Sequence, residues 1–348
     1  MSSDKINLVD LSRQQLVAML TELGERDFRI KQLWGWIYRR GIDDFVHMTD
    51  LSKRLREYLA AGYEVSWPRV KERLDSPDGT CKWVVELRDG ASVETVYIPD
   101  GNRGTVCVSS QVGCAVGCAF CATGGMGWRR NLTVSEIIGQ LKIAIQYCSR
   151  DGCNSDHAVT NVVFMGMGEP LLNLDNVLAA IEIMLDDYGY GLSKYRVTVS
   201  SSGVVPKLYQ LKEASEVAVA VSLHAANDQL RSRLVPMNQA YPIQRLLEVC
   251  NHYYKDAKRA VTIEYIMLDG INDSEKDAHM LAQLLSHGRY KINLIPFNAV
   301  NGASFSPSPM AQIDKFRDIL MSYGITTITR RSRGASIAAA CGQLVRPH

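Results

Sequence analysis

The sequence contains little that would place the chain in a membrane or outside the cell. No run of about 18 apolar residues occurs, so the sequence holds no candidate transmembrane helix. The first residues, MSSDKINLVDL, include charged side chains and lack the apolar segment of a secretory leader. We therefore expect a cytoplasmic protein with no membrane partner.

A strong net charge, low-complexity segments and internal repeats are also absent. Lys and Arg number 39 and Asp and Glu 37, which leaves a net charge of +2. This balance excludes a uniformly basic, histone-like binder, but it allows a local basic face that contacts nucleic acid. With 348 residues, of which 46 % are hydrophobic and 22 % charged, the chain is expected to form two globular domains or one large α/β domain with an appendage.

Cysteine is the residue type in which the sequence is unusual. There are nine cysteines, an odd number that cannot pair completely within one chain. In the cytoplasmic setting expected here, cysteines act as metal ligands or reactive thiols more often than as structural disulfides. They are Cys81, Cys107, Cys114, Cys118, Cys121, Cys148, Cys153, Cys250 and Cys341.

Residues 1–65 have the pattern of a small helical domain. Apolar residues recur at helical spacing over 12–23, 30–38 and 50–59. Basic residues are spread over the same region and predict either solvated helix faces or a module that contacts RNA phosphates. They are Arg26, Arg29, Lys31, Arg39, Arg40, Lys53, Arg54 and Arg56.

A β-hairpin is predicted between this domain and the rest of the chain. Residues 82–86 and 92–98 have strand composition, and Arg88-Asp89-Gly90 between them is a turn signal. We therefore assign residues 66–99 to a β-hairpin linker.

From residue 100 onward, short β-branched segments alternate with longer helical ones. Strands are predicted at 105–109, 161–165, 196–200, 217–222, 261–267 and 291–296, with helices such as 134–147, 174–185, 243–254 and 274–285 between them. This alternation is typical of parallel βαβ units, and six units favour an α/β barrel or partial barrel over residues 100–348. In such folds the chemistry lies in the loops at the carboxyl ends of the strands.

A cysteine motif follows the first predicted barrel strand. Cys114, Cys118 and Cys121 form Cys-x3-Cys-x2-Cys, and Gly113 and Gly117 let this loop turn tightly. A structural zinc ion and an ordinary iron–sulfur cluster each take four ligands, whereas three thiolates on a four-iron cluster leave one iron open. The alternatives are a zinc site completed by another cysteine, or three buried thiols.

The motif, with aromatic Phe120 before its last cysteine, resembles that of the radical S-adenosylmethionine superfamily. The resemblance implies a partial (β/α)6 TIM-like barrel and a [4Fe-4S] cluster whose open iron binds S-adenosylmethionine. Reductive cleavage of this cofactor would supply a 5′-deoxyadenosyl radical, and the protein would orient it.

Polar or glycine-rich segments follow the other predicted strands, namely MGMGEP, SSSG, SLH and PFN. Each alone is typical of a cap or turn, but their common place at strand ends favours a cofactor site. We interpret His224, which lies between Leu223 and Ala225, as a core histidine and not as an acid or base. Cys341 lies among small residues, so it is either a small buried thiol or a sulfur that another group can approach closely.

Several segments occur in the same order as in the RlmN family of dual-specificity RNA methyltransferases, which the chain resembles over nearly its whole length. They include CVSSQVGC, NLTVSEIIGQ, NVVFMGMGEPLLN, RVTVSSSGVVP, SLHAAND, INLIPFN and AACGQL, together with INLVDLSRQQL near the start. The resemblance implies methylation of C2 of an adenine in 23S ribosomal RNA and of an adenosine next to the anticodon in transfer RNAs.

The same resemblance implies roles for individual residues. Cys114, Cys118 and Cys121 would hold the cluster. Cys341 would become S-methylated, and Cys107 would be its disulfide partner. Glu94 would accept the C2 proton, whereas its place on a strand alone predicts a solvent-facing residue. The residues that would contact S-adenosylmethionine are Gly168, Glu169, Ser200, Ser222, Leu223, His224 and Asn298.

The implied cycle uses two S-adenosylmethionine molecules per turnover. One methylates Cys341, and cleavage of the second activates the S-methyl group for addition to C2. Glu94 then takes the C2 proton, and Cys107 releases the product by forming a disulfide with Cys341. The resemblance also implies an electron donor such as flavodoxin or ferredoxin, and we expect a monomer. The sequence departs from the family at 334–339, which lacks the acidic residues often found before the methylated cysteine.

Two other functions stay open on the sequence. One is the related adenine-C8 methyltransferase that confers antibiotic resistance, although Pro170 after Glu169 favours the C2 enzyme. The other is a non-catalytic, zinc-stapled RNA-binding protein. Cys81, Cys148, Cys153 and Cys250 have no predicted role.

Overall fold

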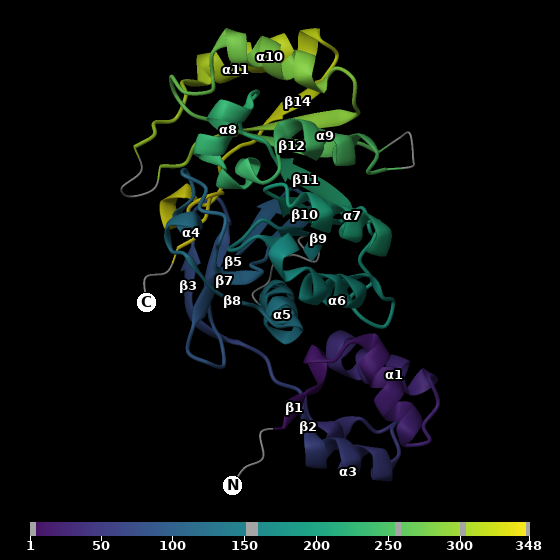
Figure 1. Cartoon of the computed structure of the whole chain (residues 1–348). Helices are drawn as coiled ribbons and strands as arrows, with labels where there is room; N and C mark the ends of the chain where they lie inside the picture. Colours follow the sequence, from purple (N-terminus) through teal and green to yellow (C-terminus); the bar gives the residue numbers. More distant parts are fainter. Residues whose placement is uncertain (1–4, 151–158, 255–258, 300–303, 346–348) are drawn as a thin grey trace.

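The protein is described by a computed structural model that covers residues 5–150, 159–254, 259–299 and 304–345. A small helical domain at the N-terminus lies beside a larger α/β domain (Figure 1). Cys153 lies outside the described residues. Within them, no helix has the length and apolar character needed to cross a membrane.

The N-terminal domain consists of short helices closed by a parallel pair of two-residue strands, β1 (Ile6–Asn7) and β2 (Tyr63–Glu64). Its helices are η1 (Leu8–Asp10), α1 (Arg13–Glu22), α2 (Phe28–Trp34), η2 (Gly35–Arg39), η3 (Phe45–His47) and α3 (Lys53–Gly62). A capping box between Ser12 and Gln15 begins α1. The three predicted helices are therefore present, and the second continues into a π-helical turn.

This domain packs against the barrel helices α5 (Val134–Arg150) and α6 (Leu174–Leu185), as Figure 1 shows. The backbone N–H of Ser135 donates to Asp10 at 2.7 Å, which joins η1 to the start of α5. Pro68 lies so close to α5 that a Cβ on Gly139 would be 2.4 Å from its Cδ. The contact surface therefore requires glycine at this position, and it fixes the domain against the barrel.

A ten-stranded sheet forms the body of the larger domain, in the order β14-β13-β12-β11-β10-β9-β6-β5-β4-β3. Neighbours from β6 to β14 are parallel, and those from β3 to β6 are antiparallel. The strands are β3 (Arg69–Asp75), β4 (Cys81–Glu86), β5 (Ser92–Asp100), β6 (Arg103–Cys107), β9 (Val159–Phe164), β10 (Val197–Ser201), β11 (Ala218–Ser222), β12 (Val261–Met267), β13 (Tyr290–Pro296) and β14 (Thr326–Thr329).

The connecting helices complete the partial α/β barrel predicted from the sequence. After α5 and α6 come α7 (Val205–Ala214), α8 (Asp228–Leu234), α9 (Ile243–Asn251), α10 (Glu275–Leu285) and α11 (Met310–Ser322). Short 3-10 helices lie at η5 (Pro170–Asn173), η6 (Pro236–Gln239) and η7 (Ala335–Ile337). A small hairpin of β7 (Gln111–Gly113) and β8 (Trp128–Asn131) encloses α4 (Ala122–Gly125).

The predicted hairpin is present as β4 and β5, and it continues the barrel sheet because β5 pairs with β6. On the other side β4 pairs with β3, a strand that the sequence did not predict. All but one of the β3 residues are exposed, and its sequence RVKERLD lacks alternating apolar residues. Its strand conformation therefore depends on the neighbour β4 and not on its own pattern.

The C-terminal segment, residues 330–345, runs from β14 at one end of the sheet to β3–β5 at the other. The N–H of Gly334 donates to Asp78 at 3.0 Å, and the hydroxyls of Ser336 and Ser76 are 3.0 Å apart. Beyond η7, the N–H of Ala122 donates to the carbonyl of Gly342. In Figure 1 this segment lies beside α4. It therefore carries Cys341 to the loop that contains the cysteine motif.

Candidate functional site

Strand register brings several of the predicted site residues onto one face of the sheet. Cys107 pairs with Val96, which shares a face with Glu94 on β5. On the parallel strands, Ser222 pairs with Glu264, and Glu264 pairs with Asn293. On β10, Thr198 and Ser200 are partly exposed, while Val197 and Val199 on the other face are buried. The face that carries the polar side chains therefore lines the open interior of the barrel, and the other face packs under the helices.

The cysteine motif forms a tight loop between β7 and α4. Gly113 has φ +75°, and a Cβ there would lie 1.8 Å from the carbonyl oxygen of Gly127. Gly124 is equally restricted, since its Cβ would lie 2.9 Å from the carbonyl oxygen of Cys118. Glycine at both positions therefore lets the two arms of the loop approach each other.

The three thiols of this loop face one another. Burial, and to a smaller extent Glu169 and Cys121, raise the pKa of the Cys114 thiol to about 11. The pKa of Cys118 is raised well above its ordinary value, first by burial and then by Cys121 and Cys114. Among the described side chains, no three His, Cys, Asp or Glu converge on a point where one metal ion would sit. The three cysteines of one loop match the number of thiolates that leaves one iron of a four-iron cluster open.

The loop after β9 holds Glu169 at the carboxyl ends of two strands. Its carboxylate accepts hydrogen bonds from the N–H of Ser202 at 2.7 Å and of Leu171 at 3.1 Å. Burial raises the pKa of Glu169, and these N–H donors lower it. Gly168 has φ +99°, and a Cβ there would lie 2.5 Å from Cβ of Gln111. Glycine thus lets the Glu169 loop lie against the start of β7.

His224 connects the end of β11 to the cysteine loop. Its ring lies edge to face with Phe120, with 4.7 Å between the ring centroids. Its Nδ1 accepts a hydrogen bond from the N–H of Ile266 at 3.0 Å. Burial, and then the nearby Arg231, lower the pKa of His224 to about 3. The imidazole is therefore neutral at physiological pH, which agrees with its interpretation as a core histidine.

Cys107 and Cys341 are both free thiols at the interior of the barrel. Desolvation raises the pKa of each to about 12. For Cys341 the further causes include Glu264, Cys107 and Cys121, so its sulfur lies near both the second thiol and the cysteine loop. Cys341 is nevertheless exposed to solvent. Its carbonyl oxygen accepts a long hydrogen bond, 3.4 Å, from Nδ2 of Asn298.

Glu94 is buried, so the expectation of a solvent-facing residue is wrong. Only 2 % of its surface is exposed, because β4 and β6 flank its strand and the C-terminal segment covers its side chain. One carboxylate oxygen is 2.9 Å from Nζ of Lys82, and the other accepts the N–H of Val345 at 3.0 Å. Burial raises the pKa of Glu94, and Lys82 counters this shift.

Sequence reasoning missed Arg231, a fully buried arginine on α8. Its guanidinium donates to the carbonyls of Ser202, Ser222 and Leu223 and to the side chain of Asn238. Burial lowers the pKa of Arg231 to about 10, so it stays charged at neutral pH. It ties together the ends of β10 and β11, and no pattern in the sequence distinguishes it from a surface arginine of an amphipathic helix.

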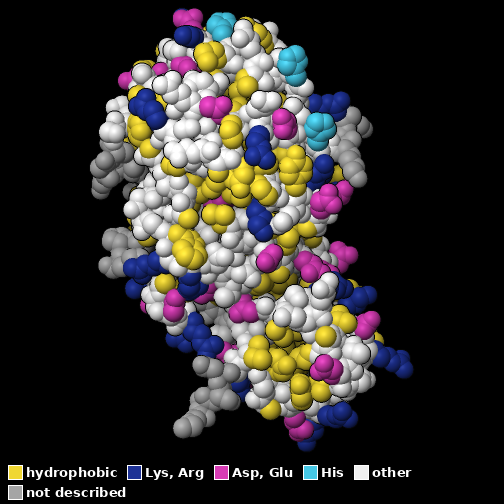
Figure 2. All heavy atoms as spheres, viewed as in Figure 1, with side chains coloured by type: hydrophobic (Ala, Val, Ile, Leu, Met, Phe, Trp, Pro, Cys, Tyr) yellow, Lys and Arg dark blue, Asp and Glu magenta, His cyan; other side chains and the backbone are white. Residues whose placement is uncertain are grey.

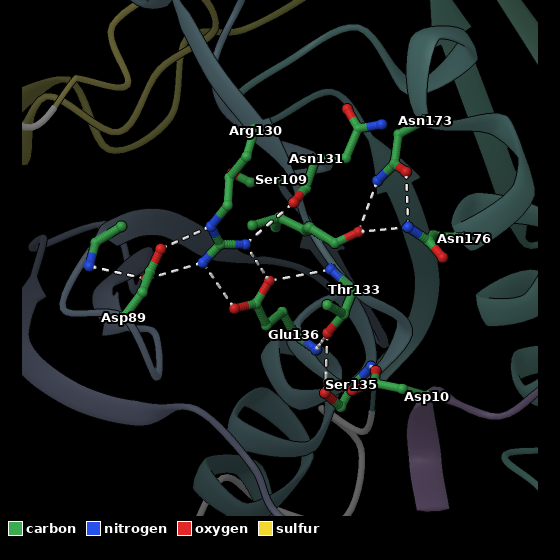
Figure 3. Close-up of polar contacts among 12 residues, drawn as sticks. Asp10, Asp89, Ser109, Arg130, Asn131, Thr133, Ser135, Glu136, Asn173 and Asn176 are labelled. Carbon is green, nitrogen blue, oxygen red and sulfur yellow. Dashed lines mark hydrogen bonds and ion pairs between the residues drawn. The ribbon is translucent and has the colours of Figure 1, made fainter. Parts of the chain in front are cut away.

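The polar residues of the NLTVSE segment, residues 131–136, belong to a network of hydrogen bonds and ion pairs (Figure 3). Arg130 on β8 lies between Asp89 of the β4–β5 turn and Glu136 of α5, with N–O distances of 2.7–2.9 Å. Asn173 donates to the carbonyls of Ser110 and Leu132 at 2.8 Å. The network therefore holds the hairpin, the β7–β8 hairpin and α5 in a fixed arrangement.

The basic residues of the N-terminal domain divide between internal and exposed roles. Arg29 pairs with Glu25 at 2.9 Å, and Arg56 donates to the carbonyl of Val46. Arg39 and Arg54 are exposed. On the face seen in Figure 2, basic and acidic side chains are interspersed.

Comparisons with known proteins identify the family of the chain. Residues 6–65 match the ribosomal RNA large subunit methyltransferase N-terminal domain, RlmN_N, and residues 108–282 match the radical SAM superfamily. The crystal structure of a radical SAM methyltransferase from Sphaerobacter thermophilus is 41 % identical, with a TM-score of 0.89, and the match covers 97 % of this chain and 99 % of that one. A domain of pyruvate-formate lyase-activating enzyme from Bacteroides vulgatus is 16 % identical over 49 % of this chain and 99 % of that chain, with a TM-score of 0.36.

Radical SAM proteins use a [4Fe-4S] cluster and S-adenosylmethionine, and these are the cofactors of this protein. The N-terminal match adds ribosomal RNA as the class of substrate. The chain therefore belongs to the RlmN family of radical S-adenosylmethionine methyltransferases.

Proposed function

We propose that the protein methylates C2 of an adenosine in 23S ribosomal RNA and of an adenosine next to the anticodon in transfer RNAs, with Cys341 as the methyl carrier. The observation that carries the proposal is the position of Cys341. Its sulfur lies near Cys107 and near the cysteine loop, although Cys341 is far from both in the sequence. Two free thiols beside a cluster loop are what a methyl-carrier and disulfide cycle requires.

Cys114, Cys118 and Cys121 would hold the cluster. Glu169 would bind the ammonium group of S-adenosylmethionine, because it is a buried carboxylate whose fixed N–H donors hold it at the strand ends. The other contacts proposed are Gly168, Ser200, Ser222, Leu223, His224 and Asn298. When bound, the cluster and S-adenosylmethionine supply a methyl group and a carbon radical. Radical chemistry is needed because adenine C2 is electron-poor and is not a nucleophile.

The two thiols have distinct tasks. Cys341 is exposed, so a methyl donor and the target base can both approach its sulfur. It accepts the methyl group as a nucleophile, for which its thiol must lose a proton. Cys107 is only 9 % exposed and lies at the end of the first barrel strand. Its sulfur attacks Cys341 to release the methylated base, which leaves a disulfide that must be reduced before the next turnover.

Glu94 is the proposed acceptor of the C2 proton. It is a buried carboxylate on the same face of the sheet as Cys107, and it contacts the backbone near Cys341 through Val345. The target adenine must leave its stack and enter the barrel to reach these groups. We further propose a cytoplasmic monomer that receives electrons from flavodoxin or ferredoxin, since a reducing compartment regenerates the two thiols.

The proposal is tested by digesting ribosomal and transfer RNA from cells with and without this protein and mapping methylated adenosines by mass spectrometry. We expect 2-methyladenosine in both RNA classes to disappear without the protein. Loss of 8-methyladenosine instead would identify the C8 enzyme. No change in either base would favour the zinc-stapled RNA-binding protein.

A further inference from the structure

Lys82 and Glu94 form a buried ion pair that contacts the backbone on both sides of Cys341. Lys82 is 5 % exposed and Glu94 is 2 % exposed, with 2.9 Å between Nζ and Oε1. Nζ of Lys82 also donates to the carbonyl of Ala338 at 3.1 Å, and Oε2 of Glu94 accepts the N–H of Val345 at 3.0 Å. The pair and the backbone from Ala338 to Val345 thus close a ring, and Cys341 lies within it.

Stability alone does not account for this pair. Removing two charges from water costs several kcal/mol, and apolar residues of similar volume are often as stable or more stable at such a place. The neighbours of the pair on the same face of β4 and β5 are the apolar Val84 and Val96. A buried lysine and glutamate among valines therefore point to a use of their charges.

Lys82 is the charged group that acts on Glu94 among the described residues. The other polar contacts of Glu94 come from the segments that follow β6 and β9 and reach only its backbone. Ser109 donates its hydroxyl to the Glu94 carbonyl, and the Glu94 N–H points to the sulfur of Met167. The C-terminal segment contributes the uncharged N–H of Val345. Among the residues that the structure describes, Lys82 is therefore the cation paired with Glu94.

We propose that Lys82 is a positioning residue that keeps Glu94 ionised, and that the Lys82–Glu94 pair couples removal of the C2 proton to release of the segment carrying Cys341. The inference rests on the proposed function. In the step concerned, the C2–H bond of the adenine joined to Cys341 breaks, its electron pair stays on the base, and the proton goes to a carboxylate oxygen of Glu94. Lys82 keeps its own proton.

The consequence for the segment follows from the change in charge. A neutral carboxylic acid is a weaker acceptor than a carboxylate, so the contacts of Glu94 with Lys82 and with the N–H of Val345 both weaken. The segment from Ala338 to Val345 is then held less firmly, and Cys341 is free to approach Cys107. Disulfide formation would thus follow proton removal and not precede it.

The test compares Lys82→Met, Lys82→Gln and Lys82→Arg, with Lys71→Met as the matched control. Lys71 lies on β3, is exposed and pairs with Glu86 at 3.6 Å, so its loss removes a lysine without touching the site. The first readout is hydrogen exchange of the amides in 338–345, which requires no catalysis. The second is the pH dependence of tritium release from RNA that carries tritium at adenine C2.

We expect exchange in this segment to accelerate about tenfold or more in Lys82→Met, and to match wild type in Lys71→Met and Lys82→Arg. Without Lys82 the pKa of Glu94 rises, so Glu94 is protonated and inactive up to a higher pH. The acid side of the tritium-release profile should therefore move up by about one pH unit or more in both Lys82→Met and Lys82→Gln. Lys82→Gln replaces Lys82→Met in both measurements if Lys82→Met does not fold, because glutamine keeps a donor for the Ala338 carbonyl and lacks the charge.

Unchanged exchange in Lys82→Met, or an unmoved profile in both uncharged variants, would overturn the inference. Failure of the proposed function has a different signature, since wild type and Lys71→Met would then release no tritium at all. If wild type releases tritium and the Lys82 variants behave like wild type, only the proposed role of the Lys82–Glu94 pair is refuted.

Discussion

Replacing Arg231 by methionine should destabilise the barrel and weaken binding of S-adenosylmethionine. Arg231 is fully buried, and its guanidinium satisfies the carbonyls of Ser202, Ser222 and Leu223. Leaving one buried acceptor without a partner costs about 1–3 kcal/mol. The variant no longer has to remove a guanidinium from water, which offsets part of the cost of the unsatisfied carbonyls. We therefore expect the free energy of unfolding to fall by about 2–5 kcal/mol.

This loss should appear in thermal unfolding of the anaerobic, cluster-loaded protein. At about 2–4 °C per kcal/mol for a domain of this size, the Tm should fall by about 4–20 °C. The affinity for S-adenosylmethionine should fall about tenfold or more, because the N–H of Ser202 also orients Glu169. Arg245→Met, at an exposed position of α9, is the matched control and should shift the Tm by about 2 °C or less. If Arg231→Met behaved like this control in both measurements, the assignment of Arg231 as the tie between the strand ends would be refuted.

The remaining predictions concern the thiols, the cluster and the glycine before Glu169. Cys341→Ala should abolish methyl transfer, whereas Cys107→Ala should accumulate a covalent protein–RNA adduct visible on a denaturing gel; normal turnover in Cys107→Ala would disprove its role. Anaerobically prepared protein should be brown, lose its colour in air and contain about four irons and four sulfides per chain, and zinc in place of iron would contradict the cluster. Gly168→Ala should weaken S-adenosylmethionine binding about tenfold or more through strain at a positive φ and contact with Gln111. Gly101→Ala, at a positive φ with nothing within 4 Å, should bind normally.

Much of the barrel could be predicted from local sequence pattern. The strand Val261–Met267 and the helix Leu174–Leu185 have the predicted bounds, because each is a periodic apolar segment between clear turn signals. The helix Val205–Ala214 was not predicted; its first turn contains a proline, which is tolerated there although it disrupts a helix interior. The edge strand Arg69–Asp75 was also missed, since it is charged and depends on its partner strand.

The arrangement of the site depends on contacts between distant residues, which local pattern does not contain. Glu94 is buried because residues near the C-terminus, more than 200 positions later, cover its strand, and its N–H partner is Val345. Lys82 had a weak signal, a lone charge within the apolar segment CKWVV, but its contact with Ala338 could not be foreseen. The cysteine motif, by contrast, is local, so its spacing, Phe120 and its place after the first barrel strand could all be read from the sequence.

The central claim is that the methyl group reaches RNA from Cys341 and not directly from S-adenosylmethionine. It is tested by loading Cys341 with a ¹³C-labelled methyl group, removing free cofactor, and allowing a single turnover with unlabelled S-adenosylmethionine and RNA. The account predicts that the first 2-methyladenosine formed carries ¹³C and that the label leaves Cys341 in equal amount. An unlabelled methyl group in the first product, with ¹³C still on Cys341, would contradict it.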